Sequence, residues 1–232
     1  GMRPVILERL HAAHQGIQRT KELARRYLYW PGMSTEIQNM DKRSTVCQQL
    51  MPKNQKEPLK PHKLPELPWY KLGVDIFELK GQSFLLTVDY FSKYQEVQQI
   101  LDKAACAVVG KLKAVFARHG IPKEIISDHV PFASAEVRQF AKDWGINWKY
   151  SSPGYPQSNG MAERSIKTIK LMLKKAEQGK MGPHLALLSL RNTPVTGLGY
   201  LPAELLMGRV LWSTLPIASG ALKPKHPKDV KK

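Results

Sequence analysis

Short apolar runs alternate with helical stretches between residues 70 and 150. Three runs rich in β-branched and aromatic residues, joined by short connections, predict consecutive strands that pair antiparallel. A 3.6-residue apolar period then predicts a helix over 103–120 with Asp102 as its cap, followed by strand, helix and strand. This order predicts an α/β layered domain built on a five-stranded mixed sheet with flanking helices. The predicted strands are 72–79, 83–90, 94–100, 123–128 and 146–150, and the second predicted helix is 134–145.

The flanking regions predict further parts of the chain. Residues 1–51 have helical periodicity and form a small helical domain in this interpretation. Residues 52–69 contain five prolines, which disfavour both helix and central strand and therefore indicate an extended linker. The main domain then spans 70–217. The last residues, 218–232, combine lysine and proline with few apolar groups, which is typical of a disordered basic tail.

The chain is strongly basic, and this narrows its partners. It has 36 Lys and Arg against 19 Asp and Glu in 232 residues, a formal net charge of +17. The basic residues recur along the whole chain, which favours a polyanion partner such as nucleic acid over simple solubility with a solvated tail. No apolar stretch approaches the roughly 20 residues needed to cross a bilayer, so no membrane partner is expected. Two well-separated cysteines indicate no disulfide scaffold and a reducing, intracellular location.

Three acidic residues stand where strands end or a helix begins. Asp75 lies in the run LGVDIFEL, Asp128 ends KEIISD, and Glu163 opens a lysine-rich helix predicted from about 160 to 178. Carboxylates at such positions can converge at one edge of a sheet. They repel one another unless a divalent ion lies between them. Two magnesium ions held about 3.5–4 Å apart promote in-line displacement at phosphorus.

The same helix carries a row of basic residues. Glu163, Lys167, Lys170 and Lys174 follow one another at spacings that place them on one face. An ordinary solvated face with a Glu–Lys pair one turn apart would give the same pattern. Together with the two upstream aspartates, the row favours a functional face on which lysines are aligned with the third carboxylate.

Five sequence blocks, in order, resemble the integrases of Ty3/Gypsy-type LTR retrotransposons and host genes derived from them, within the retroviral integrase superfamily. The resemblance covers residues from about 5 to 217. The blocks are HQGIQRTKELARRYLYWPGM, PWYKLGVDIFELKGQSFLLTVDYFSKY, FARHGIPKEIISD, SSPGYPQSNGMAER and LRNTP with PAELLMGR.

This resemblance implies a fold, an activity and a location. It implies a ribonuclease H-like catalytic core after a small helical zinc-finger-like domain, with Asp75, Asp128 and Glu163 as the triad that binds Mg²⁺ or Mn²⁺. The implied activity is a polynucleotidyl transfer that trims the 3′ ends of element DNA and joins them to target DNA in the nucleus. Related enzymes act as multimers, which implies a homo-oligomer. The residues implied to contact DNA are Gln157, Ser158, Asn159, Lys167, Lys170 and Lys174.

The chain departs from the family pattern at the zinc site. The family uses two histidines and a Cys-x-x-Cys pair, matched here by His11, His14 and Cys47, but Ser44 stands at the first cysteine position. A serine hydroxyl is a poor zinc ligand beside a thiolate. Zinc is therefore expected to be weakly held or absent from a degenerate site, with three protein ligands plus water as the alternative.

A second departure follows Asp128. The family carries Asp-Asn-Gly-Pro-Gln-Phe, whereas this chain reads Asp128-His129-Val130-Pro131-Phe132 and is one residue shorter before Glu163. Glycine in such a turn often serves a backbone conformation that a branched residue resists. Two hypotheses therefore stay open: a metal-dependent DNA integrase, or an integrase-derived domain with weak or no activity that binds nucleic acid or protein. A ribonuclease H-like nuclease unrelated to integration is a third, disfavoured by the SSPGYPQSNGMAER block.

Overall fold

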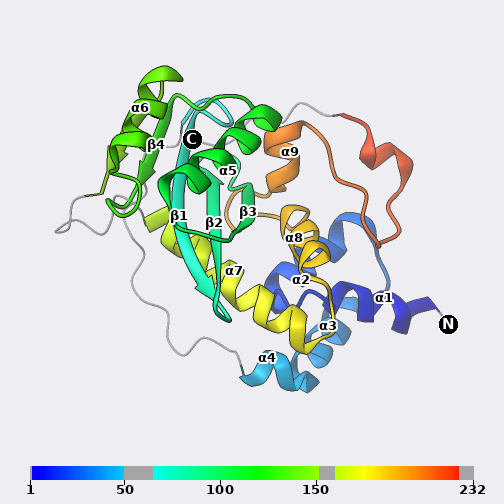
Figure 1. Cartoon of the computed structure of the whole chain (residues 1–232). Coiled ribbons are helices and arrows are strands. Elements are labelled where there is room, and N and C mark those ends of the chain that lie inside the picture. The colour runs from blue at the N-terminus through cyan, green and yellow to red at the C-terminus, as the bar shows by residue number, and fades with distance from the viewer. Residues whose placement is uncertain (1, 50–64, 152–159, 225–232) are drawn as a thin grey trace. The chain divides into compact units, whose positions relative to one another are not determined.

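The computed structural model describes residues 2–49, 65–151 and 160–224, and it divides the chain into two compact units. The sheet unit comprises Leu59–Thr168, and the helical unit comprises Gly1–Pro58 together with Ile169–Lys232 (Figure 1). Most of the predicted linker 52–69 lies outside the described residues.

The sheet unit is built on five strands in the order β3-β2-β1-β4-β5. Strands β1, β2 and β3 pair antiparallel as predicted, and β4 and β5 continue the sheet parallel to β1. Lys80 and Gly81 both have positive φ in the β1–β2 turn, as a two-residue hairpin turn with the matching twist requires. The predicted mixed sheet is therefore confirmed. The strands are β1 (Lys71–Leu79), β2 (Gln82–Asp89), β3 (Gln95–Ile100), β4 (Glu124–Ser127) and β5 (Asn147–Tyr150).

Two crossover helices complete the core of this unit. Helix α5 (Ala105–His119) buries an apolar face that contacts β3 and α6 (Ala135–Asp143). Ser134 caps α6 by accepting a hydrogen bond from the backbone N–H of Val137. The prediction that Asp102 caps α5 is wrong, because the N-cap residue is Ala104 and the Asp102 carboxylate accepts from the Ala104 N–H at 3.0 Å. Asp102 thus orders the turn that leads into the helix.

A carboxylate ties three neighbouring strands together at the start of β4. Glu124 contacts Lys71 Nζ of β1 at 3.0 Å and Lys149 Nζ of β5 at 2.7 Å. Burial raises the pKa of the Glu124 carboxyl, but the hydrogen bonds from the two lysines outweigh burial and hold the pKa below its ordinary value. The pair of contacts stabilises the parallel half of the sheet.

The N-terminal part of the helical unit consists of four short helices. They pack around a cluster formed by six buried residues from α1 to α3, and the Trp30 indole N–H reaches the Glu36 carboxylate at 3.1 Å. These helices agree with the helical character predicted for this part of the chain. The helices are α1 (Met2–His11), α2 (Ile17–Tyr27), α3 (Met33–Arg43) and α4 (Thr45–Gln49).

The C-terminal part of the helical unit contacts these helices directly. Arg26 of α2 pairs with Glu204 of α9 at 2.7 Å, and Asn192 bonds both the N–H and the C=O of Leu211. Of the predicted tail, Ser219–Leu222 form a short 3₁₀ helix (η2). Among the helices that the structure describes, none is long and apolar enough to cross a lipid bilayer. The remaining helices are α7 (Gly160–Gln178), which begins in the sheet unit, α8 (Pro183–Arg191) and α9 (Pro202–Met207).

Candidate functional sites

Two of the predicted catalytic acids follow paired positions of adjacent parallel strands. Val74 of β1 pairs with Ser127 of β4, so Asp75 and Asp128 each come one residue later at the same level of the sheet. Asp75 is half-buried and its Oδ1 accepts from the N–H of Ile76 at 2.7 Å. Asp128 is exposed and its Oδ1 accepts from the Ser151 hydroxyl at 2.6 Å. The parallel register therefore carries both carboxylates to the same edge.

Glu163 lies in the first turn of α7, which packs against the strand that carries Asp75. A Cβ added at Gly73 would lie 3.3 Å from the Cβ of Ala162 and 3.2 Å from Val88 Cγ1. The missing side chain at position 73 is what lets this turn approach β1. Gly73 and Asp75 share a face of the strand because strand side chains alternate. The start of α7 thus lies on the face to which Asp75 belongs.

The three acids do not form a closed metal-binding group in this structure. Among the described residues, the only group of three or more His, Cys, Asp or Glu whose ligand atoms come together is His11, His14 and Cys47. Carboxylates without a cation between them repel one another, which is a physical reason for separated oxygens. The structure brings the three residues to one region of the sheet unit and leaves their oxygens apart.

The altered loop after Asp128 has a defined anchor. Phe132 is fully buried, and its carbonyl accepts a hydrogen bond from the Tyr150 hydroxyl at 3.2 Å. The His129 ring lies against the same tyrosine, with centroids 5.3 Å apart. Val130 is 85% exposed, and no residue from His129 to Ala133 has a positive φ. The loop therefore needs no residue with the backbone freedom of glycine.

Helix α7 presents its predicted basic row to solvent. Lys167 and Lys174 are exposed, Lys170 is half-buried, and Glu163 at the start of the row is exposed. The opposite side is buried, so the helix is amphipathic with the lysines on its outer face. The residues predicted to approach DNA ends, Gln157, Ser158 and Asn159, lie outside the described residues. The buried residues of α7 are Ala162, Ser165, Ile169, Met172, Lys175 and Ala176.

The candidate metal-binding group in the helical unit is formed by residues from the end of α1, the segment that follows it, and α4. His11 ends α1, His14 lies in the following turn with φ 48°, and Cys47 lies in α4. Cys47 Sγ is 3.4 Å from His11 Nε2 and 3.4 Å from His14 Nδ1, and all three ligand atoms lie within 4.8 Å of one another. His14 Nε2 faces Gly179, where a Cβ would approach it to 2.6 Å. Residues far apart in the sequence thus bring three potential metal-ligand atoms close together.

The environment favours the metal-binding forms of the histidines. The pKa of His14 is lowered to about 4, mainly by burial, with smaller contributions in the same direction from His11 and Lys175 and an opposing one from Asp41. Burial also lowers the pKa of His11. Both rings are therefore neutral at neutral pH and keep a lone pair for a metal. Burial raises the pKa of the Cys47 thiol, and a hydrogen bond with Ser44 partly opposes this.

The donor set fits zinc. Zn–S bonds of about 2.3 Å and Zn–N bonds of about 2.0–2.1 Å place tetrahedral S and N ligands roughly 3.5 Å apart. The two observed separations of 3.4 Å match that spacing. Ser44 Oγ accepts from the Cys47 N–H at 3.3 Å and so lies beside the group. The expectation that zinc is weakly held or absent because of Ser44 is not supported by this geometry.

Two buried charged residues beside this group were missed by the sequence analysis. Asp41 is 7% exposed, and its Oδ1 is 4.0 Å from His11 Nε2. Lys175 is 6% exposed, and its ammonium donates to the His14 carbonyl at 3.0 Å. Charged residues on amphipathic helices normally face solvent, so periodicity alone hides them. The available signal for Asp41 was its position one helical turn before Ser44.

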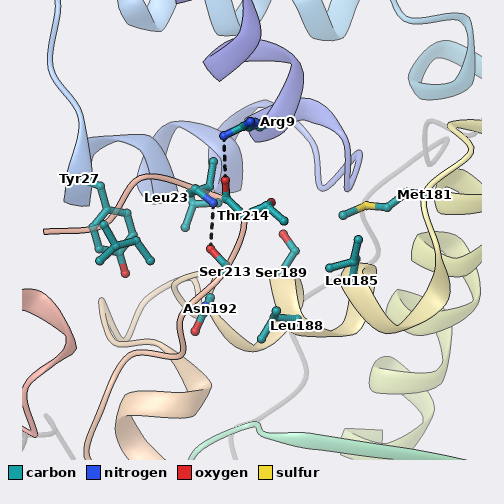
Figure 2. A pocket seen from close by; sticks show the side chains of 12 residues that line it. Arg9, Leu23, Tyr27, Met181, Leu185, Leu188, Ser189, Asn192, Ser213 and Thr214 are labelled. Atoms are coloured by element: carbon teal, nitrogen blue, oxygen red, sulfur yellow. Dashed lines mark hydrogen bonds between the residues drawn. The ribbon is translucent and has the colours of Figure 1, made fainter. Parts of the chain in front are cut away.

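A pocket lies within the helical unit (Figure 2). Its walls include Leu23, Leu185 and Leu188, and Arg9 donates to the carbonyl of Thr214 at 3.2 Å. None of the residues lining it is a carboxylate, histidine or cysteine. This pocket therefore offers neither a carboxylate nor a histidine or cysteine ligand for a metal.

Comparison with known proteins identifies the class to which these two sites belong. The integrase zinc binding domain family matches residues 1–53, and the integrase core domain family matches residues 66–156. The chain therefore belongs to the integrase family, as its sequence resemblance indicated. The predicted fold, a ribonuclease H-like core preceded by a small helical zinc-binding domain, is confirmed.

The similar curated proteins are long polyproteins or uncharacterised. The chain is 34% identical over 223 residues to the uncharacterized protein K02A2.6 of Caenorhabditis elegans, covering 93% of this chain and 18% of that protein. It is 34% identical over 218 residues to the Gag-Pol polyprotein of baboon endogenous virus (88% and 13%). It is 30% identical over 172 residues to the transposon Tf2-3 polyprotein of Schizosaccharomyces pombe (69% and 13%). The chain thus spans less than a fifth of each of these relatives.

Solved structures share the fold. The catalytic core domain of BIV integrase has a TM-score of 0.52 at 25% identity, covering 60% of this chain and 93% of that one. A chain of the simian T-cell lymphotropic virus intasome, solved with PP2A regulatory subunit B56 gamma, has a TM-score of 0.58 at 22% identity (83% and 73%). The HTLV-2 integrase catalytic core domain, solved with magnesium in a trimeric form, has a TM-score of 0.50 at 20% identity (61% and 98%).

Proposed function

We propose that this protein is a metal-dependent polynucleotidyl transferase acting on DNA, which processes 3′ ends and joins them to target DNA. It has an integrase core domain, and that family belongs to the polynucleotidyl transferase superfamily. The observation that carries the proposal is the parallel register of β1 and β4, in which Asp75 and Asp128 follow directly paired residues. Glu163 begins the helix packed on that strand. These three carboxylates are the proposed catalytic residues.

The triad has the donors for a hard divalent cation. Carboxylate oxygens are the ligands preferred by Mg²⁺ and Mn²⁺, and the related HTLV-2 core was solved with magnesium. Asp75, Asp128 and Glu163 would hold the ions, which supply charge stabilisation and an activated oxygen nucleophile at phosphorus. The hydrogen bonds of Ile76 and Ser151 orient the two aspartates in advance.

Substrate binding in this proposal is electrostatic. The chain carries a net charge of +17, and Lys167, Lys170 and Lys174 extend along α7 from the proposed catalytic Glu163. Phosphate contacts of this kind supply sequence-independent affinity that falls steeply as salt rises. Gln157, Ser158 and Asn159 are proposed to contact DNA just before this helix. By analogy with an intasome and a trimeric core among the similar structures, we propose that the protein works as a homo-oligomer, in the nucleus.

A second candidate function is DNA binding with weak or no catalysis. The observations that favour it are the changed loop after Asp128 and the separated oxygens of the three acids. A displacement of about 1 Å in a catalytic group can cost roughly 100-fold in rate. In that case the basic surface of α7 binds DNA although strand transfer is slow or absent.

A strand-transfer assay with Mn²⁺ and short DNA duplexes that carry the ends of a related element separates the two functions. The transferase forms joined product, and Glu163→Gln abolishes it without changing DNA affinity. Glu136→Gln, a matched change in the exposed first turn of α6, leaves product formation unchanged. No product from the unaltered protein, with salt-sensitive DNA binding intact, would support the second function.

The basic surface can be tested by charge reversal. Lys167→Glu with Lys170→Glu should weaken binding to DNA of any sequence and flatten its salt dependence, because phosphate contacts are lost. Lys111→Glu with Lys142→Glu, at exposed positions of α5 and α6, makes the same change in net charge elsewhere. Equal losses in both double variants, measured by fluorescence anisotropy, would show that only overall charge matters.

A further inference from the structure

Two histidines and one thiolate leave the zinc site of this chain short of negative charge. Where the family pattern has a second cysteine, Ser44 offers a neutral hydroxyl that accepts a hydrogen bond from the Cys47 N–H. Zinc with a single thiolate would keep one net positive charge in a buried place. The ammonium of Lys175, 6% exposed, adds a further positive charge beside it. Buried uncompensated charge is costly, so a bound zinc ion needs another anion.

Asp41 is the anion that the structure supplies. It lies in α3 one helical turn before Ser44, and only 7% of the residue is exposed. Its Oδ1 lies 4.0 Å from His11 Nε2. A buried carboxylate needs a compensating cation. The Lys175 ammonium lies in the same region, and a zinc ion held by His11 and Cys47 would be a second cation beside Asp41.

Asp41 could either orient a metal-bound His11 or bind the metal itself, and the ring nitrogen of His11 that it faces decides between these two roles. A carboxylate that merely orients a metal-bound histidine bonds the ring nitrogen that does not touch the metal. Asp41 instead faces Nε2, the same nitrogen that faces Cys47 Sγ at 3.4 Å. The carboxylate therefore lies on the metal-facing side of the ring.

We propose that Asp41 is the fourth zinc ligand, so that this site is made of His11, His14, Cys47 and a carboxylate in place of the second thiolate. Carboxylate oxygen binds zinc at about 2.0–2.2 Å. Tetrahedral N and O ligands then lie roughly 3.4 Å apart, against 4.0 Å between Asp41 Oδ1 and His11 Nε2. Because Asp41 lies outside the group formed by the other three donors, its side chain would have to turn toward them when zinc binds. The thiolate and the carboxylate together cancel the charge of the ion. Ser44 then hydrogen-bonds Cys47 without binding the metal.

The test measures zinc affinity of the full chain by competition with a chromophoric chelator. Asp41→Asn keeps the shape and removes the charge, and it should weaken zinc binding by more than about 100-fold, beyond the range expected for an outer-shell partner. Ser44→Ala should weaken binding by at most about 10-fold. Cobalt substitution gives a second readout: the intense visible absorption of four-coordinate Co²⁺ should persist in Ser44→Ala and be lost in Asp41→Asn.

A rescue variant separates ligand loss from misfolding. Asp41→Asn combined with Ser44→Cys restores a second anionic donor and should recover zinc affinity. Circular dichroism of the zinc-free proteins should show that Asp41→Asn retains its helices, since a buried charge is removed. Zinc affinity unchanged by Asp41→Asn, an equal loss in Ser44→Ala, or a double variant with no recovery would each overturn the proposal.

Discussion

Gly73→Ala tests how closely the first turn of α7 is held against the strand that carries Asp75. An added Cβ would lie 3.2 Å from Val88 Cγ1, 3.3 Å from Ala162 Cβ and 3.3 Å from Tyr90 Cε2. Carbon atoms pack best at about 3.5–4.0 Å, so each of the three neighbours must retreat by a few tenths of an ångström. Overpacking of this kind costs about 1–3 kcal/mol, and the reduced freedom of the unfolded chain returns about 0.4–1 kcal/mol. The net loss of unfolding free energy should be about 0–2.6 kcal/mol, centred on about 1.3 kcal/mol.

The same change should reduce catalysis more than stability alone requires, because Ala162 precedes Glu163. A displacement of a catalytic group by about 1 Å can lower the reaction rate roughly 100-fold. A shift of Glu163 by a few tenths of an ångström should therefore lower the strand-transfer rate by about 3- to 10-fold, under conditions where the protein stays folded. Urea denaturation and the strand-transfer rate measure the two effects. Gly110→Ala, in α5 with open space around it, is the control and should stabilise by about 0.5–1 kcal/mol. A Gly73→Ala variant that is stabilised as much as Gly110→Ala would refute the close approach of α7 to β1.

Two further predictions concern the sheet and the zinc site. Glu124→Gln should lower the unfolding free energy by about 1 kcal/mol at neutral pH, because it weakens two partly exposed ion pairs. The pKa of the Glu124 carboxyl is lowered in the folded state. Its contribution to the unfolding free energy is therefore present above the unfolded pKa of about 4.3 and is lost as the pH falls through the folded pKa. If urea denaturation shows that Glu124→Gln is still less stable than the unaltered protein at lower pH, this reasoning is contradicted. Gly179→Ala should displace the His14 ring, which an added Cβ would approach to 2.6 Å, and weaken zinc binding by about 10-fold or more. Gly182→Ala, where nothing lies within 4 Å of the added Cβ, should leave zinc affinity unchanged. Equal zinc affinities in the two variants would show that Gly179 does not help to position the His14 ring.

Local pattern was enough to predict the elements of the sheet unit. Strand and helix periods differ, and the runs around Asp75 and Asp128 are bounded by turn residues, so all five strands could be predicted within a few residues. The sequence also suggested that the ends of two strands meet at one edge. The paired positions that precede the two aspartates, and the role of Gly73 in admitting α7, depend on contacts between distant segments. Such contacts leave no periodic signal.

The zinc site shows where reading residue types one by one is insufficient. Ser44 at a cysteine position suggested a degenerate site, yet His11, His14 and Cys47 bring their donor atoms together. Asp41 and Lys175 are buried charges on amphipathic helices, and a sequence pattern assigns such residues to the solvent face. The burial of Asp41 and Lys175 depends on how α3 and the end of α7 pack around the segment that contains His14. No single segment of the sequence specifies this packing.

Anomalous diffraction from crystals of the full chain soaked in Mn²⁺ tests the proposed transferase most directly. The proposal predicts manganese bound jointly by the carboxylates of Asp75 and Asp128, with Glu163 turned toward the ion. Saturating Mn²⁺ with no anomalous peak within coordination distance of both aspartates would contradict it.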